Sequence, residues 1–277
     1  MSQLSDADFY TKASSGLRLL LTNALNLFRE SVFTSKAGHR QGAVILAGLA
    51  VEEAAKFHIL LDAVRCPRGP ARISHLRRHF YDHLARGIYA DHYDNYPSSF
   101  ADVRAWANNS RIALYLDGPE GFEWVFRNRI AERREQQLYV DYVQVEEDHQ
   151  WVAPNRRLCF APVVPTTILA VARALAKAGV TEAPALSVVA DLWRGFQISD
   201  STSWGELHQK NLEVLTAIRD RGSLRSDCEV AFLCERWAFP LVGLDLTEDT
   251  SVTITDLRRV RDEAEARWIA REVGHPY

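Results

Sequence analysis

Apolar residues at helical spacing are the feature that most restricts the fold of this chain. Between residues 6 and 36 they recur every three or four positions, as Leu17, Leu20, Leu21, Ala24, Leu25 and Phe28. This spacing gives a helix one apolar stripe, and Ser5 followed by Asp8 has the pattern of an N-terminal capping box. We therefore predict one long helix over about 6–36.

The same reasoning predicts helices along most of the chain. A second helix, over about 40–64, has apolar residues on nearly all sides and should lie at the centre of a bundle. A third is expected over about 71–93, after a break at Pro67, Gly69 and Pro70. Residues 139–162 are expected to be irregular or partly extended. Further helices are predicted over about 100–116, 120–137, 166–178, 184–196, 204–221 and 255–273.

This pattern indicates an all-α protein. Long helices with short connections are typical of antiparallel helical bundles. No strands alternate with helices, so a doubly wound sheet is not indicated. The sequence also contains no GxGxxG, GxxxxGK[ST] or GxSxG motif, which removes the usual signals for nucleotide binding and for an α/β-hydrolase. We expect no cofactor.

Composition restricts location and partners. The formal net charge is −3, with 47% hydrophobic and 25% charged residues, which predicts no general attraction to nucleic acid or to an anionic membrane. No apolar run approaches the roughly 18 residues of a membrane span, and the N-terminus has no basic leader. The four cysteines are scattered without a CxxC pair. We therefore expect a cytoplasmic protein with no membrane partner and no metal-binding cysteine cluster.

One segment departs from this balance. Residues 65–86 contain six arginines and only one acidic residue, Asp82. His75, His79 and His83 follow one another at intervals of four, and His92 lies shortly after. On a single helix the first three would form a slowly drifting stripe. Any chemistry that the protein performs is therefore expected near residues 72–92.

Three interpretations of this segment remain open. RNA can be cleaved without metal, because its 2′-hydroxyl is a built-in nucleophile; histidine can move the protons and arginine can stabilise the charged phosphorane. Alternatively, two of the histidines could bind a transition metal, although the first and third of the stripe would lie about 12 Å apart along the helix. The third interpretation is an ordinary solvated basic face.

Spacing alone does not identify one catalytic pair. Arg-x₄₋₆-His occurs five times in the segment, so a region rich in both residues satisfies the pattern by chance. The pairs are Arg68/His75, Arg72/His79, Arg77/His83, Arg78/His83 and Arg86/His92.

Three stretches, in order, resemble the AbiV family of abortive-infection proteins, which belongs to the HEPN superfamily of helical bundles. The first is a small-apolar helix that runs from Ala47 into Glu52-Glu53-x-x-Lys56. The second, residues 80–86, has an aromatic residue before His-x-x-basic. The third is Arg133 to Tyr142, followed by Trp151 and Pro154. The resemblance covers roughly residues 10–160, and residues 163–277 resemble no family that we can name.

The resemblance implies a four- to five-helix bundle with a role in defence against phage. Many HEPN proteins resemble metal-independent RNases with an Arg-(polar)-x₃-His motif, often as dimers in which two motifs face one cleft. Arg78 to His83 fits that motif, with His79 as the polar residue. Arg86 stands where we would expect a lysine. The resemblance thus implies Arg78, His79 and His83 as catalytic residues.

Other charged residues are candidates for supporting the site or binding nucleic acid. Either Glu52 or Glu53 could point toward Arg78 or His83 and tune its pKa. Alternatively, Glu52 and Lys56 form an ordinary i, i+4 ion pair. Arg134 could extend a nucleic-acid surface or belong to a mixed solvated face. The full supporting set is Glu52, Glu53, Lys56, Arg77, Arg86 and Arg134.

These observations lead to two hypotheses about function. In the first, an AbiV/HEPN-like bundle over residues 1–160, with a C-terminal helical region of unknown role over 161–277, acts as a phage-defence effector that cleaves or binds RNA. In the second, the chain is a non-catalytic interaction protein that senses a phage product or binds the translation machinery. A homodimer fits the first hypothesis, since paired sites could share a cleft.

Overall fold

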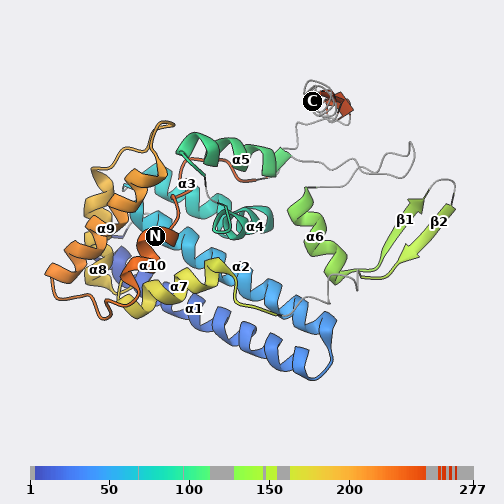
Figure 1. The fold of residues 1–277 in the computed structure, drawn as a ribbon, viewed down its shortest axis with the longest axis horizontal. Coiled ribbons are helices and arrows are strands. Elements are labelled where there is room, and N and C mark those ends of the chain that lie inside the picture. Colours follow the sequence, from blue (N-terminus) through green and yellow to red (C-terminus); the bar gives the residue numbers. More distant parts are fainter. Residues whose placement is uncertain are drawn as a thin grey trace, which may run out of the picture.

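The structure is a computed structural model, which describes residues 4–67, 69–95, 97–112, 128–145, 148–154 and 163–247, together with isolated positions between 255 and 266. The described part contains ten helices and one hairpin of two strands (Figure 1). The all-α prediction is therefore confirmed. The helices are α1 (Asp6–Lys36), α2 (Arg40–Arg65), α3 (Pro70–His79), α4 (His83–His92), α5 (Phe100–Ile112), α6 (Arg129–Leu138), α7 (Thr167–Ala178), α8 (Ala183–Arg194), α9 (Trp204–Asp220) and α10 (Val230–Arg236), and the strands are β1 (Asp141–Val145) and β2 (Asp148–Val152).

Helices α1 and α2 form a long antiparallel hairpin, as predicted. The Ser5 side chain caps α1 by accepting a hydrogen bond from the backbone N–H of Asp8. Gly38, with φ of 87°, supplies the left-handed residue that the turn into α2 needs. The C-terminal half of α2 is buried without interruption from Phe57 to Arg65. Because α2 contacts α1, α3, α4, α6, α7 and α8, it is the central helix of the bundle.

The prediction of a single helix over 71–93 is wrong, because the chain breaks into α3 and α4 at residues 80–82. Asp82 is extended, and its carboxylate accepts a hydrogen bond from the backbone N–H of Ala85 at 2.8 Å. That is N-cap geometry, which starts a new helix. The stripe of His75, His79 and His83 is therefore split, and His83 becomes the first residue of α4.

Of the C-terminal helices, α7 and α8 pack on the α1–α2 hairpin, α9 packs on α8, and α10 packs on α7 and α9. Residues of all these helices belong to one hydrophobic core. Three buried side chains of α2 reach this region. His58 bonds the carbonyl of Ile168, Arg65 donates to the carbonyl of Ala238, and Asp62 accepts from the backbone N–H of Leu241. Packing is continuous across the predicted boundary near residue 160. The boundary itself stays a prediction, as does the helix over 255–273, most of which lies outside the described residues.

The β-hairpin lies beyond α6, away from the α8–α10 end of the molecule (Figure 1). It falls within the segment predicted to be irregular or partly extended. Tyr142 pairs with Trp151 across the two strands, with ring centroids 4.9 Å apart. Both residues are more than half exposed.

No helix in the described part of the chain is long and apolar enough to span a membrane.

Candidate functional site

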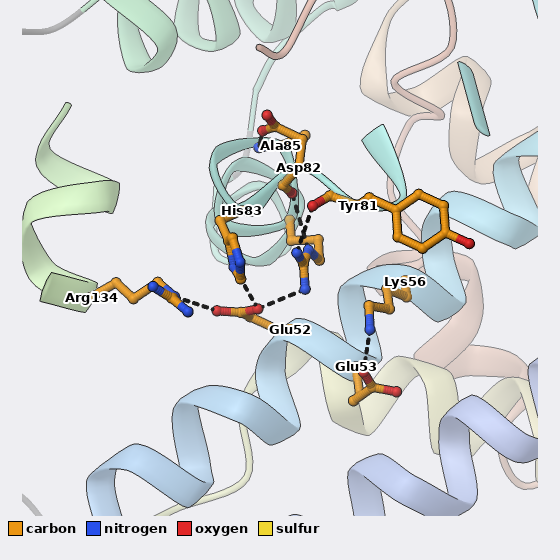
Figure 2. A network of polar contacts seen from close by, with 9 residues as sticks. Glu52, Glu53, Lys56, Tyr81, Asp82, His83, Ala85 and Arg134 are labelled. Atoms are coloured by element: carbon orange, nitrogen blue, oxygen red, sulfur yellow. Dashed lines mark hydrogen bonds and ion pairs between the residues drawn. The ribbon is translucent and has the colours of Figure 1, made fainter. Parts of the chain in front are cut away.

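Glu52 on α2 gathers three basic side chains from two other helices (Figure 2). Its Oε2 lies 3.0 Å from Nδ1 of His83 and 2.8 Å from Nη1 of Arg86, both on α4. Its Oε1 lies 2.9 Å from Nε of Arg134 on α6. We call Glu52, His83, Arg86 and Arg134 the Glu52 cluster. Four residues that were candidates from the sequence thus meet in one place.

His83 is the exposed member of the cluster. Its side chain is 52% exposed, whereas that of Glu52 is 15% exposed. A carboxylate can only accept hydrogen bonds, so Nδ1 of His83 donates to Glu52. The ring is held through that nitrogen, and Nε2 has no hydrogen-bond partner among the residues that the structure describes. This is the geometry of a proton-transfer histidine oriented by a carboxylate.

Arg86 is the most buried basic residue of the cluster and bonds several of its neighbours. Its side chain is only 8% exposed. Besides Glu52, the guanidinium donates to the carbonyl oxygens of Tyr81 and Asp82. Both carbonyls belong to the 80–82 linker between α3 and α4. Arg86 therefore fastens this linker to α2 and positions Glu52, which in turn orients His83.

Arg134 reaches the cluster because α6 packs closely on α4. Gly87 of α4 lies against Ile130 of α6, where a Cβ at position 87 would have no room. The side chain of Arg134 is 32% exposed and uses Nε for Glu52. Its neighbour Arg133 pairs instead with Asp91. Of the arginines in this stretch, Arg134 thus contributes to the site.

The neighbouring glutamate serves a different surface. Glu53 pairs with Lys56 on the side of α2 that faces away from His83 (Figure 2). The ion pair proposed between Glu52 and Lys56 is therefore wrong, because Lys56 pairs with Glu53. Glu53 and Arg77 both line a separate cavity between α1, α2 and α3. These three supporting candidates, Glu53, Lys56 and Arg77, lie outside the Glu52 cluster.

Two of the residues named as catalytic also lie outside the cluster. His79 is only 2% exposed, its Nδ1 is 3.1 Å from Nδ1 of His75, and burial lowers its pKa to about 4. Arg78 is exposed in the last turn of α3, where its charge acts on His79 and Asp245. No contact joins Arg78 to His83 in the described part of the chain. The roles of Arg78 and His79 stay predictions.

Among the described residues, no group of three or more His, Cys, Asp or Glu side chains lies close enough together to hold a metal ion. His75 and His79 do lie together, with ring centroids 4.9 Å apart. However, Nε2 of His75 already bonds the carbonyl of Ile59.

The sequence pointed to every member of the Glu52 cluster but missed the central role of Glu52. It also missed the carbonyls of Tyr81 and Asp82. One local signal was available, since Asp82 precedes the helical run from His83 and is a favourable N-cap residue. That signal would have moved His83 from the middle of a helix to its first turn.

Comparison with known proteins supports the resemblance found in the sequence. The family model for AbiV, a HEPN family, matches residues 12–158, which is more than half of the chain. The match contains all four residues of the Glu52 cluster. Searches of curated proteins and of solved structures find no match. The chain therefore belongs to the AbiV family of HEPN proteins.

Proposed function

We propose that this protein is an abortive-infection effector that cleaves RNA without a metal ion at the exposed side of the Glu52 cluster. Membership of the AbiV family indicates a defence role of the abortive-infection, HEPN type. RNA cleavage is a more specific proposal than a defence role, and one observation supports it. The half-exposed ring of His83 is anchored to Glu52 through Nδ1, which leaves Nε2 to face a substrate.

The chemistry needs a base on one side of the phosphorus and an acid on the other. Nε2 of His83 takes the proton from the 2′-hydroxyl, and O2′ attacks phosphorus while the bond to O5′ breaks. The departing O5′ takes a proton from a second, protonated imidazole. His83 of a second copy would supply it, which accounts for the homodimer predicted from the sequence. The products are a 2′,3′-cyclic phosphate and a 5′-hydroxyl.

Cations near His83 would stabilise the phosphorane. Arg134 is partly exposed beside Glu52, and Arg78 is exposed just before the linker that leads to His83. A guanidinium offers two parallel donors that match phosphate oxygens. Glu52 would keep the His83 ring in one tautomer, and Arg86 would position Glu52. Arg86 is thus a positioning residue rather than a catalytic one.

A second function is favoured by a different surface. The hairpin and the residues just before it expose several large apolar side chains, which suits a non-catalytic protein that binds a phage or host protein. These residues are Tyr139, Val140, Tyr142, Trp151 and Val152.

The experiment that separates the two functions is RNA cleavage by the purified full chain in the presence of a chelator. We expect products with 2′,3′-cyclic ends, and His83→Ala should abolish them. His39→Ala is the matched control, because His39 is an exposed histidine at the start of α2, outside the cluster. Undiminished cleavage by His83→Ala would move the activity elsewhere. No cleavage by the wild type would favour the interaction protein.

A further inference from the structure

A cavity of about 820 Å³ lies between α1, α2 and α3, next to the Glu52 cluster but distinct from it. Its walls are mainly apolar, with Phe9, Leu60 and Leu76 among the lining residues. Leu19 and Tyr81 also line it and are 69% and 77% exposed. A volume of this size, apolar with few polar groups, is typical of small-molecule sites.

The charged residues of the cavity indicate the polarity of its ligand. Arg72 already has partners within the protein. It donates to the carbonyl of Cys66, and its guanidinium carbon lies 4.4 Å from the centre of the Phe9 ring. Glu53 is paired with Lys56. Arg77 is exposed and has no ion-pair partner among the residues that the structure describes. An apolar cavity with one uncommitted cation complements an apolar molecule that has one anionic group.

The cavity and the Glu52 cluster share the 80–82 linker. Phe80 and Tyr81 line the cavity, and the ammonium of Lys56 lies 5.8 Å from the centre of the Phe80 ring. The carbonyl of Tyr81 is bonded by Arg86, which holds Glu52. A ligand that displaces Phe80 or Tyr81 would therefore alter the support of the His83 ring.

We propose that this cavity binds a small amphipathic anion, and that its occupancy is transmitted through the 80–82 linker to His83. Binding itself is independent of the function proposed above. Only the consequence for RNA cleavage rests on that function.

Binding is tested with two probes on the full chain, decanoate and the fluorescent anion anilinonaphthalene sulfonate. We expect decanoate to displace the fluorescent probe. Arg77→Gln should weaken decanoate binding about tenfold, because a hydrogen-bonded charge pair is lost. Arg18→Gln is the matched control, since Arg18 is also exposed and adjoins Leu19 on α1 but does not line the cavity. Equal affinity in Arg77→Gln and the wild type would overturn the proposal.

Transmission is tested by the NMR signals of the His83 ring, which need no RNA. Saturating decanoate should shift these signals in the wild type, and Arg77→Gln should move the midpoint of the shift to higher decanoate concentration. Unchanged His83 signals at saturation would refute the coupling even if RNA is cleaved. Conversely, a shift in a protein that cuts no RNA would support the coupling and count against the nuclease.

A second copy of the chain is the competing occupant. Leu19→Glu should reduce decanoate binding and leave the sedimentation coefficient unchanged. If Leu19→Glu instead dissociates a dimer, and decanoate does not bind the wild type, the cavity is a contact between copies and the proposal fails.

Discussion

Two of the three carboxylates on helix α2, Glu52 and Asp62, lie ten positions apart and differ mainly in their surroundings. Asp62 is only 2% exposed and bonds the Tyr89 hydroxyl at 2.7 Å, the backbone N–H of Leu241 at 3.0 Å and Arg65 at 3.3 Å. Glu52 also takes three partners, but one of them is the half-exposed His83. Both carboxylates form ion pairs with basic side chains, but only Glu52 has a partner that is exposed to solvent.

The histidines of the two regions differ in burial. His58, His75, His79 and His92 are buried, and burial lowers their pKa values to between about 3 and about 4. Near neutral pH they are uncharged and serve as hydrogen-bonding groups of the core. His83 also makes a hydrogen bond, in its case to the carboxylate of Glu52, but its side chain is half exposed. The comparison teaches that access, rather than residue type, separates the candidate active histidine from the structural ones.

Acidification should produce the largest effect and should act on the buried region. The unfolded chain binds protons at the ordinary histidine pKa, whereas the folded chain resists until about 3 to 4. The stabilising contribution is thus complete above the unfolded pKa and is lost as pH falls. From about pH 7 to about pH 5 we expect a loss of roughly 1–2 kcal/mol for each of the four histidines.

Asp62 opposes this trend, because burial raises its pKa from 3.8 to about 6. As pH falls, the folded state therefore binds this proton before the unfolded state does, which favours folding. Four histidines outweigh one carboxyl group, so the free energy of unfolding should fall on acidification. Urea titrations at several pH values measure it. Stability that is flat or rising toward about pH 5 would contradict the assignment of these histidines as buried and neutral.

Asp62→Ala should have the next largest effect. The Arg65 guanidinium contacts the rings of Trp193 and Trp237 and would be left as a buried charge without a counter-ion. Removing one partner of a buried pair costs about 3–5 kcal/mol. Thermal and urea unfolding of the variant measure the loss. A loss below about 1 kcal/mol would mean that Asp62 and Glu52 differ less than their burial indicates.

Arg86→Lys should have an intermediate effect on stability and should also affect the His83 ring. Lysine keeps the charge but cannot bond Glu52 and the carbonyls of Tyr81 and Asp82 with one planar fork. We expect a loss of about 1–3 kcal/mol in stability. The ring signals of His83 should also broaden or shift in NMR spectra. A destabilised variant with unchanged His83 signals would restrict Arg86 to a purely structural role.

His83→Ala should have the smallest effect on stability. The side chain is half exposed and bonds only Glu52 in the described part of the chain. We therefore expect a change below about 0.5 kcal/mol, although RNA cleavage is lost. Unfolding and cleavage are measured on the same preparation. A loss of stability comparable to that of Asp62→Ala would place His83 with the core and not with a site.

Much of the secondary structure follows from short-range information. The apolar spacing and the Ser5 cap predicted α1, and the all-round apolar character of the second helix predicted the central position of α2. These features depend on neighbours three or four residues apart, which the sequence displays directly. The missed break before His83 is also local, because the Asp82 cap competes with continuation of the helix.

The sequence by itself determined the helical pattern, the family and the set of basic and acidic residues from which a site can be built. Only the tertiary structure decided which of them meet. Glu52 and Arg134 are 82 positions apart, and Arg65 and the carbonyl of Ala238 are 173 apart. Such pairs form only when helices pack, and packing also decides burial, so that His79 lies within the core while His83, four residues later, faces water.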